Sequence, residues 1–117
     1  MIPLLAGGHG WERQDGLVFL PRDGAVKLVM PIGDTSNRFL DLNFEYPKEV
    51  KIKPLKLDIS FDGITWQSIN LKNSTDNAIL PISISESSIK DGFISISLKR
   101  PENQDSIKLR LVFAKFR

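Results

Sequence analysis

The sequence predicts an all-β fold, and three observations support this prediction. Apolar and polar residues alternate in short runs, most regularly in Asn37–Tyr46, Phe93–Leu98 and Ser106–Phe116. Turn-forming residues separate each run from the next, and no window shows the spacing of an amphipathic helix. Because each run is apolar on one side, the runs are best buried as two facing layers. We therefore expect a two-sheet antiparallel jelly-roll β-sandwich of about eight strands.

Turns that contain glycine or proline set the bounds of the first predicted strands. Ala6–Glu12 is rich in glycine and is expected to be a loop. Turns at Asp15–Gly16 and Pro21–Gly24 enclose a short strand, Leu17–Leu20. A second strand, Ala25–Ile32, is bounded by Pro31 and by the polar loop that follows. The third, Asn37–Tyr46, has the clearest alternation, with its inward residues at Leu40, Leu42, Phe44 and Tyr46.

The hairpin Leu55–Leu71 is the most informative segment, because Asp62–Gly63 forms a turn signal between two alternating runs. A two-residue turn would place Ile59 opposite Trp66 and bury the tryptophan. A three-residue loop with Gly63 in the left-handed region would instead place Leu55 opposite Ile69.

The three-residue loop is favoured because it keeps Ile69 and Leu71 on the same face as the other apolar residues of the hairpin. Trp66 then lies on the outer face beside Asp58. The two hairpin registers thus make opposite predictions for this tryptophan.

Three strands are expected after the hairpin, at Ala78–Ile84, Phe93–Leu98 and Ser106–Phe116. Pro81 indicates a sheet edge or a bulge in the first of them, because proline cannot donate to a ladder. In the last strand the inward residues are expected to be Ile107, Leu109, Leu111 and Phe113. Three phenylalanines are expected on faces opposite the core, namely Phe39, Phe93 and Phe116.

Length and composition indicate a single domain over residues 1–117, which would also fit within a longer protein. The net charge of +2 comes from 16 basic and 14 acidic residues that are mixed along the chain, which argues against nucleic acid as a partner. Disulfides are excluded because there is no cysteine. With no signal-like leader and no apolar run of about 20 residues, we expect no membrane span and a cytoplasmic location.

The sequence offers little support for catalysis. His9 is the only histidine, and no nucleophile motif accompanies it. Glu12 and Asp15 are the nearest carboxylates, but such pairs arise by chance among 14 acidic residues. Two clusters of Asp and Asn are better explained as turn formers than as calcium ligands, namely Asp34, Asn37 and Asp41, and Asn73, Asp76 and Asn77. We therefore expect no enzyme activity, no cofactor and no metal.

Aromatic residues are the remaining candidates for binding. Sugar rings present apolar C–H faces that stack on aromatic planes, while their hydroxyls need polar partners nearby. Trp11 and Trp66 are the predicted stacking residues. The predicted hydrogen-bonding residues are His9, Glu12, Arg13 and Asp58.

Two resemblances give these candidates a context. Ser60–Trp66 resembles a strand-turn-strand signature of galactose-binding-like sandwiches, including carbohydrate-binding modules. The chain is also similar, more loosely, to jelly-roll domains appended to bacterial glycosyltransferases of surface-polysaccharide assembly. The segments that carry this second likeness are Gly10–Glu12, Asp15–Phe19, Val29–Pro31, the Leu55–Leu71 hairpin, Ile79–Pro81 and Asp105–Leu111.

The resemblances imply a non-catalytic accessory domain that binds a glycan or polysaccharide beside a glycosyltransferase domain. Tethering would then raise the local concentration of the glycan. The alternative is a structural interaction domain that forms a homo-oligomer or packs on a partner and has no sugar site.

Overall fold

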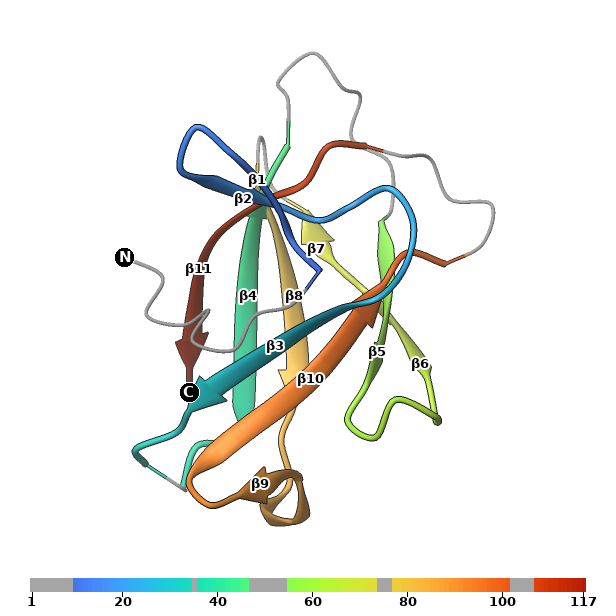
Figure 1. The fold of residues 1–117 in the computed structure, drawn as a ribbon. Helices are drawn as coiled ribbons and strands as arrows, with labels where there is room; N and C mark the ends of the chain where they lie inside the picture. Colours follow the sequence, from blue (N-terminus) through green and yellow to red (C-terminus); the bar gives the residue numbers. More distant parts are fainter. Residues whose placement is uncertain (1–9, 35, 47–54, 74–76, 102–106) are drawn as a thin grey trace.

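The computed structural model describes residues 10–34, 36–46, 55–73, 77–101 and 107–117. These residues form two antiparallel sheets (Figure 1). The six-stranded sheet consists, in spatial order, of β1 (Glu12–Gln14), β2 (Leu17–Phe19), β11 (Arg110–Phe116), β4 (Phe39–Glu45), β8 (Asn77–Ser83) and β7 (Lys72–Asn73).

The five-stranded sheet crosses in front of the first in Figure 1. Its strands, in spatial order, are β3 (Val26–Pro31), β10 (Phe93–Lys99), β5 (Lys56–Ser60) and β6 (Gln67–Asn70), with β9 (Ile89–Lys90) paired to β10. A short 3-10 turn, Glu86–Ser88, precedes β9. Within the described ranges no helix is long and apolar enough to cross a membrane.

The connections confirm the predicted jelly roll. If β2, β3, β4, β5, β6, β8, β10 and β11 are numbered one to eight in chain order, the sheets read 1-8-3-6 and 2-7-4-5. First pairs with last, second with seventh, third with sixth and fourth with fifth, which is the nested pairing of a jelly roll. The short strands β1, β7 and β9 extend this framework and were not predicted.

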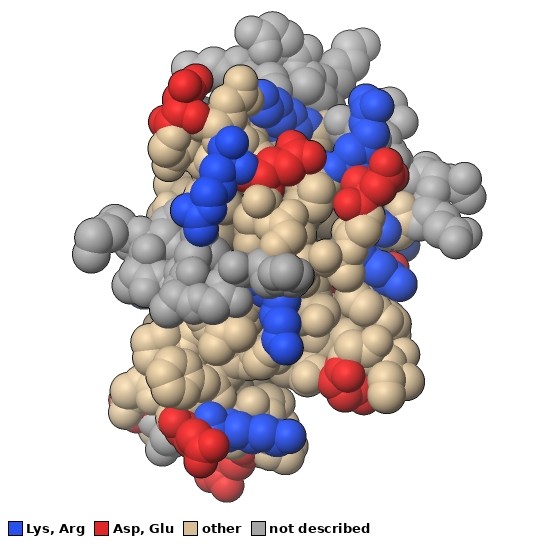
Figure 2. All heavy atoms as spheres, in the orientation of Figure 1, with Lys and Arg blue, Asp and Glu red and all other residues tan. Residues whose placement is uncertain are grey.

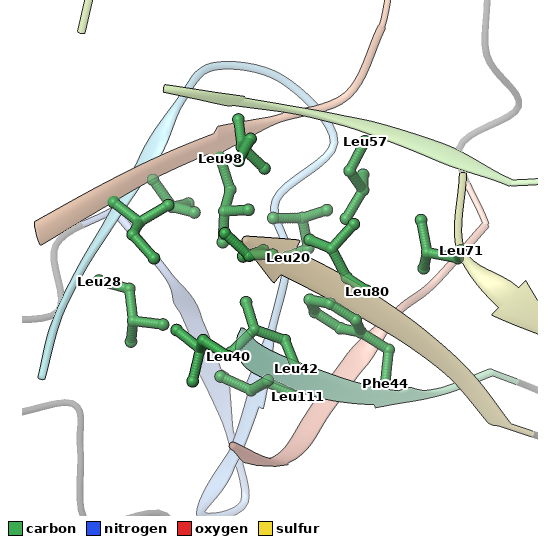
Figure 3. Close-up of a cluster of buried hydrophobic side chains, with 14 of the residues drawn as sticks. Leu20, Leu28, Leu40, Leu42, Phe44, Leu57, Leu71, Leu80, Leu98 and Leu111 are labelled. Carbon is green, nitrogen blue, oxygen red and sulfur yellow. The ribbon is translucent and has the colours of Figure 1, made fainter. Parts of the chain in front are cut away.

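The core lies between the two sheets (Figure 3). Alternate residues of each long strand point inward, so Leu40, Leu42 and Phe44 of β4 are fully buried. Leu57 of β5 and Leu98 of β10 face them from the other sheet. The predicted inward residues of the third strand are thereby confirmed. Burial of this two-sided apolar set is the main stabilising term of the fold.

One prediction for the last strand is wrong. Leu111 pairs with Phe44, but the next pair is Phe113 with Asn43, so β11 contains one extra residue, Val112. This bulge reverses the inside and outside faces beyond it. Phe113 is therefore 41% exposed, whereas Phe116, which was expected outside, packs against the core.

The hairpin adopts neither of the two registers considered. Leu57 pairs with Ile69, and a six-residue connection, 61–66, joins β5 to β6. The face assignment of the favoured alternative is nevertheless confirmed, because Ile69 and Leu71 lie on the core side. Gly63 has a φ of +78°, as predicted.

Pro81 lies at an edge, as predicted. It pairs with Asp41 of β4 on one side of β8, while the short β7 reaches only Ala78 and Ile79 on the other side. The missing backbone donor of the proline is tolerated there because no strand among the described residues pairs with that part of β8 on its open side.

Candidate functional site

A groove of the described structure lies at a notch in the five-stranded sheet. One side of β10 pairs with β3 along its length, from Phe93 to Leu98. The other side pairs with β9 up to Ile94 and with β5 from Ser97 onward. Neither β9 nor β5 covers Ser95 and Ile96. Residues of the β5–β6 connection and of the segment that contains the 3-10 turn line one groove together with Ser95. Both segments lie at the lower end of the molecule in Figure 1.

The groove at this notch has a volume of about 860 Å³. Ligand pockets usually measure about 300–1,000 Å³. Serine hydroxyls dominate its polar lining, and two phenylalanine rings supply apolar surface. We call it the serine groove; its lining residues are Lys27, Phe61, Asp62, Ser83, Ile84, Ser85, Ser87, Ser88, Lys90, Phe93 and Ser95.

Asp62 fixes the wall formed by the β5–β6 connection. Its Oδ1 accepts hydrogen bonds from the backbone N–H of Thr65 at 2.7 Å and of Ile64 at 2.8 Å, and from Ser60 Oγ at 2.9 Å. Ser60 Oγ in turn accepts the Gly63 N–H at 2.8 Å. The bonds from Thr65, Ile64 and Ser60, in that order, lower the pKa of Asp62 to about 2. The carboxylate is thus charged at neutral pH and shapes the loop.

Ser85 organises the opposite wall. Its Oγ lies 2.9 Å from Ser87 Oγ and 3.1 Å from Ser88 Oγ, so three hydroxyls form one local network. A hydroxyl both donates and accepts, so this network leaves hydrogen-bonding capacity for a ligand. Phe93 stands beside it on β10 and is 45% exposed.

The charged groups of the serine groove are Lys27, Lys90 and Asp62. Both lysines are exposed, and neither has an ion-pair partner among the described residues. Figure 2 shows the face of β3 and β10, on which acidic and basic side chains are interspersed rather than gathered by sign. Any preference of the serine groove for charged ligands therefore depends on its own lining residues and not on the charge of the whole face.

The predicted residues of the N-terminal part lie elsewhere. Trp11 donates its indole N–H to the carbonyl oxygen of Lys27 at 3.1 Å and packs against the core. Glu12 and Arg13 are exposed on β1. His9 lies outside the described residues. Trp11 thus has a structural role in tying β1 to the edge strand β3.

Trp66 and Asp58 form a separate cluster. Lys99 Nζ lies 4.1 Å from the Trp66 ring centroid, and Lys99 is the register partner of Asp58. The carboxylate of Asp58 accepts a hydrogen bond from Ser68 Oγ at 2.5 Å. Trp66 therefore lies on the outer face beside Asp58, as the favoured hairpin alternative predicted.

The two tryptophans lie at opposite edges of the five-stranded sheet. Trp11 bonds to β3, whereas Trp66 directly precedes β6. Three strand spacings separate these edges, or about 14 Å. The predicted residues are thus not gathered into one site, neither tryptophan lines the serine groove, and their role in binding stays a prediction.

Sequence reasoning missed the groove itself, although some of its residues gave a signal. Phe93 was expected on an outer face, and Ser85–Gly92 was recognised as a polar connection. Their meeting at the notch depends on where the pairing of β5 and β9 with β10 stops, which alternation does not encode.

The structure shows no metal centre within the described ranges, where no three His, Cys, Asp or Glu side chains are grouped. Asp41, one of the oxygen donors considered for calcium, instead accepts hydrogen bonds from the guanidinium of Arg117 at 2.6 and 3.4 Å. Asp34 accepts from the N–H and Oγ of Ser36, and these bonds, the hydroxyl first, lower its pKa. Turn and ion-pair formation account for these two carboxylates.

Comparison of the chain with protein-family models, with curated proteins and with solved structures yields no match.

Proposed function

We propose that this chain is a non-catalytic carbohydrate-binding domain and that the glycan binds in the serine groove. The observation that carries the proposal is the lining, in which five serine side chains and the rings of Phe61 and Phe93 share one groove of about 860 Å³. Sugars need apolar surface for their C–H faces and polar partners for their hydroxyls. The serine groove offers both.

The geometry favours an extended chain of sugars over a single enclosed molecule. The groove is open to solvent and runs past Ser95 of β10, from Lys27 on β3 to the β5–β6 connection. Its walls are fixed by the Asp62 and Ser85 hydrogen-bond networks. A preformed groove loses little conformational entropy on binding.

The biological setting rests on the resemblance to jelly-roll domains of bacterial surface-polysaccharide glycosyltransferases. In that setting the domain would be cytoplasmic and would hold a polysaccharide beside a glycosyltransferase domain. Tethering would raise the effective concentration of glycan at the catalytic site without any chemistry in this domain.

A structural interaction domain is the second candidate, and one observation favours it. Leu17 of β2 and Phe113 of β11 are 39% and 41% exposed on neighbouring strands of the six-stranded sheet. Exposed apolar side chains on adjacent strands are typical of contact surfaces. This surface lies on the other sheet from the serine groove, so the two functions can be tested separately.

A glycan array followed by titration calorimetry tests the proposal, with sedimentation analysis of the same sample. We expect binding to at least one polysaccharide and a monomeric protein. Absence of binding to every polysaccharide, together with a stable dimer that Phe113→Ser dissociates, would replace the carbohydrate function by the interaction function.

A further inference from the structure

We propose that the serine groove selects acidic polysaccharides, in which sugar units carry a carboxylate. This inference rests on the proposed carbohydrate function and specifies its ligand class. It follows from the charges in the lining, where two lysines, Lys27 and Lys90, accompany the single carboxylate of Asp62.

Asp62 does not neutralise the two lysines by direct pairing. Its Oδ1 is engaged by Thr65, Ile64 and Ser60 in the turn, and no ion pair joins it to a lysine among the described residues. An ammonium group without a carboxylate partner is a donor that a ligand carboxylate can satisfy.

The two lysines come from separate elements. Lys27 is on β3, and Lys90 is on β9, which pairs with the start of β10. The serine hydroxyls and Phe93 belong to the same lining. A polymer that lies in the groove would meet an ammonium group from each of two elements and the apolar ring of Phe93. A repeating carboxylate fits this distribution better than a single charge.

A polysaccharide array tests the selection. Acidic polymers, namely polygalacturonate, alginate and hyaluronate, are compared with neutral dextran, galactan and xylan, and with highly methyl-esterified pectin. Methyl esterification removes the charge of polygalacturonate and leaves its backbone unchanged. We expect binding to an acidic polymer, loss of that signal for its esterified form, and weaker binding at higher salt concentration.

Lysine variants then test whether Lys27 and Lys90 cause the preference for acidic polysaccharides. Lys27→Gln and Lys90→Gln should each weaken binding about threefold, and the double variant about tenfold. Lys115→Gln is the matched control, because Lys115 is an exposed lysine on the six-stranded sheet. This variant has the same net charge as Lys27→Gln and Lys90→Gln. Its affinity should equal that of the unaltered protein.

The results separate this inference from the proposed function. Equal binding of neutral and acidic polymers would overturn the charge selection and leave the carbohydrate function intact. Binding to no polymer would contradict both. A Lys115→Gln effect as large as the groove variants, or equally tight binding of a single-stranded oligonucleotide, would show general polyanion attraction and overturn the inference.

Discussion

The ammonium nitrogen of Lys99 lies 4.1 Å from the centroid of the Trp66 ring. Lys99 is on β10, whereas Trp66 ends the connection between β5 and β6. The contact thus ties that connection to the outer face of the five-stranded sheet. It also covers part of the indole with a protein cation, which leaves less of the ring for a sugar.

Replacing Lys99 by methionine tests this contact, because Lys99→Met removes the charge and keeps much of the apolar chain. We expect the free energy of unfolding to fall by about 0.5–1 kcal/mol, measured by urea denaturation. Lys115→Met is the exposed control and should change it by less than about 0.5 kcal/mol. Glycan binding in the serine groove should not change. If Lys99→Met changes binding in either direction, the Lys99–Trp66 pair belongs to the site.

The bulge in β11 makes a prediction that reverses the one from simple alternation. Phe113→Ser should change the free energy of unfolding by less than about 0.5 kcal/mol, because Phe113 is exposed. Phe116→Ser should cost about 1–2 kcal/mol, because Phe116 packs against the core. Chemical denaturation of the two variants measures both free energies of unfolding. The reverse order of stabilities would mean that β11 alternates without a bulge.

This pair of phenylalanines also shows how far the sequence predicts the fold. Alternation located the long strands and the inward residues of β4, because each face of a strand meets one environment. It failed beyond Val112, since one extra residue reverses the faces and leaves no local mark in the composition. The short strands β1, β7 and β9 were missed because two or three residues carry too little periodicity.

The candidate site was less predictable than the fold. The two tryptophans were predicted to stack on sugar rings. In the structure Trp11 anchors β1 to β3, and the ring of Trp66 is in contact with the ammonium group of Lys99. The serine groove is assembled from β3, β9, β10, the end of β8 and two connecting segments, which are distant in sequence. Its existence depends on the end of pairing at Ser95, which is a tertiary property.

Asp62 should make stability depend on pH under acidic conditions. Its pKa is about 2 in the folded protein, compared with an ordinary value of 3.8. Because the folded value is the lower one, the carboxylate stabilises the fold above about pH 4, and this stabilisation is lost as the pH falls toward 2. We expect Asp62→Asn to reduce the loss of stability between pH 5 and pH 2, measured by urea denaturation.

The control for Asp62 is Asp23→Asn, which removes another exposed carboxylate from a turn. Asp23 has no hydrogen bond to other described residues, so its variant should keep the acid dependence of the unaltered protein. An identical acid dependence in all three proteins would mean that the Asp62 hydrogen bonds do not persist in solution.

Arg100 joins segments that are far apart in the sequence. Its guanidinium donates to the carbonyl oxygens of Ile107 at 2.7 Å, Pro21 at 3.1 Å and Leu20 at 3.4 Å. Burial lowers the pKa of Arg100, and the carboxylate of Glu12 opposes this shift. The side chain thus bridges the end of β10, the β2–β3 connection and the approach to β11.

Loss of this bridge should be costly. Arg100→Met keeps apolar contacts but leaves carbonyl groups without their charged donor, so we expect a loss of about 2–3 kcal/mol in the free energy of unfolding. Arg22→Met, at an exposed position in the β2–β3 connection, should change it by less than about 0.5 kcal/mol. Equal stabilities by urea denaturation would show that the three carbonyls are satisfied by water instead.

Phe93 provides the most direct test of the serine groove. Its ring is 45% exposed on β10, so Phe93→Ala should leave folding nearly unchanged while removing the apolar surface for a sugar ring. We expect about tenfold weaker glycan binding by titration calorimetry. Phe113→Ala is the matched control, because that ring is 41% exposed on the other sheet. The two rings are similarly exposed and differ chiefly in the sheet to which they belong. If only the Phe113 variant loses binding, the ligand therefore binds on the six-stranded sheet.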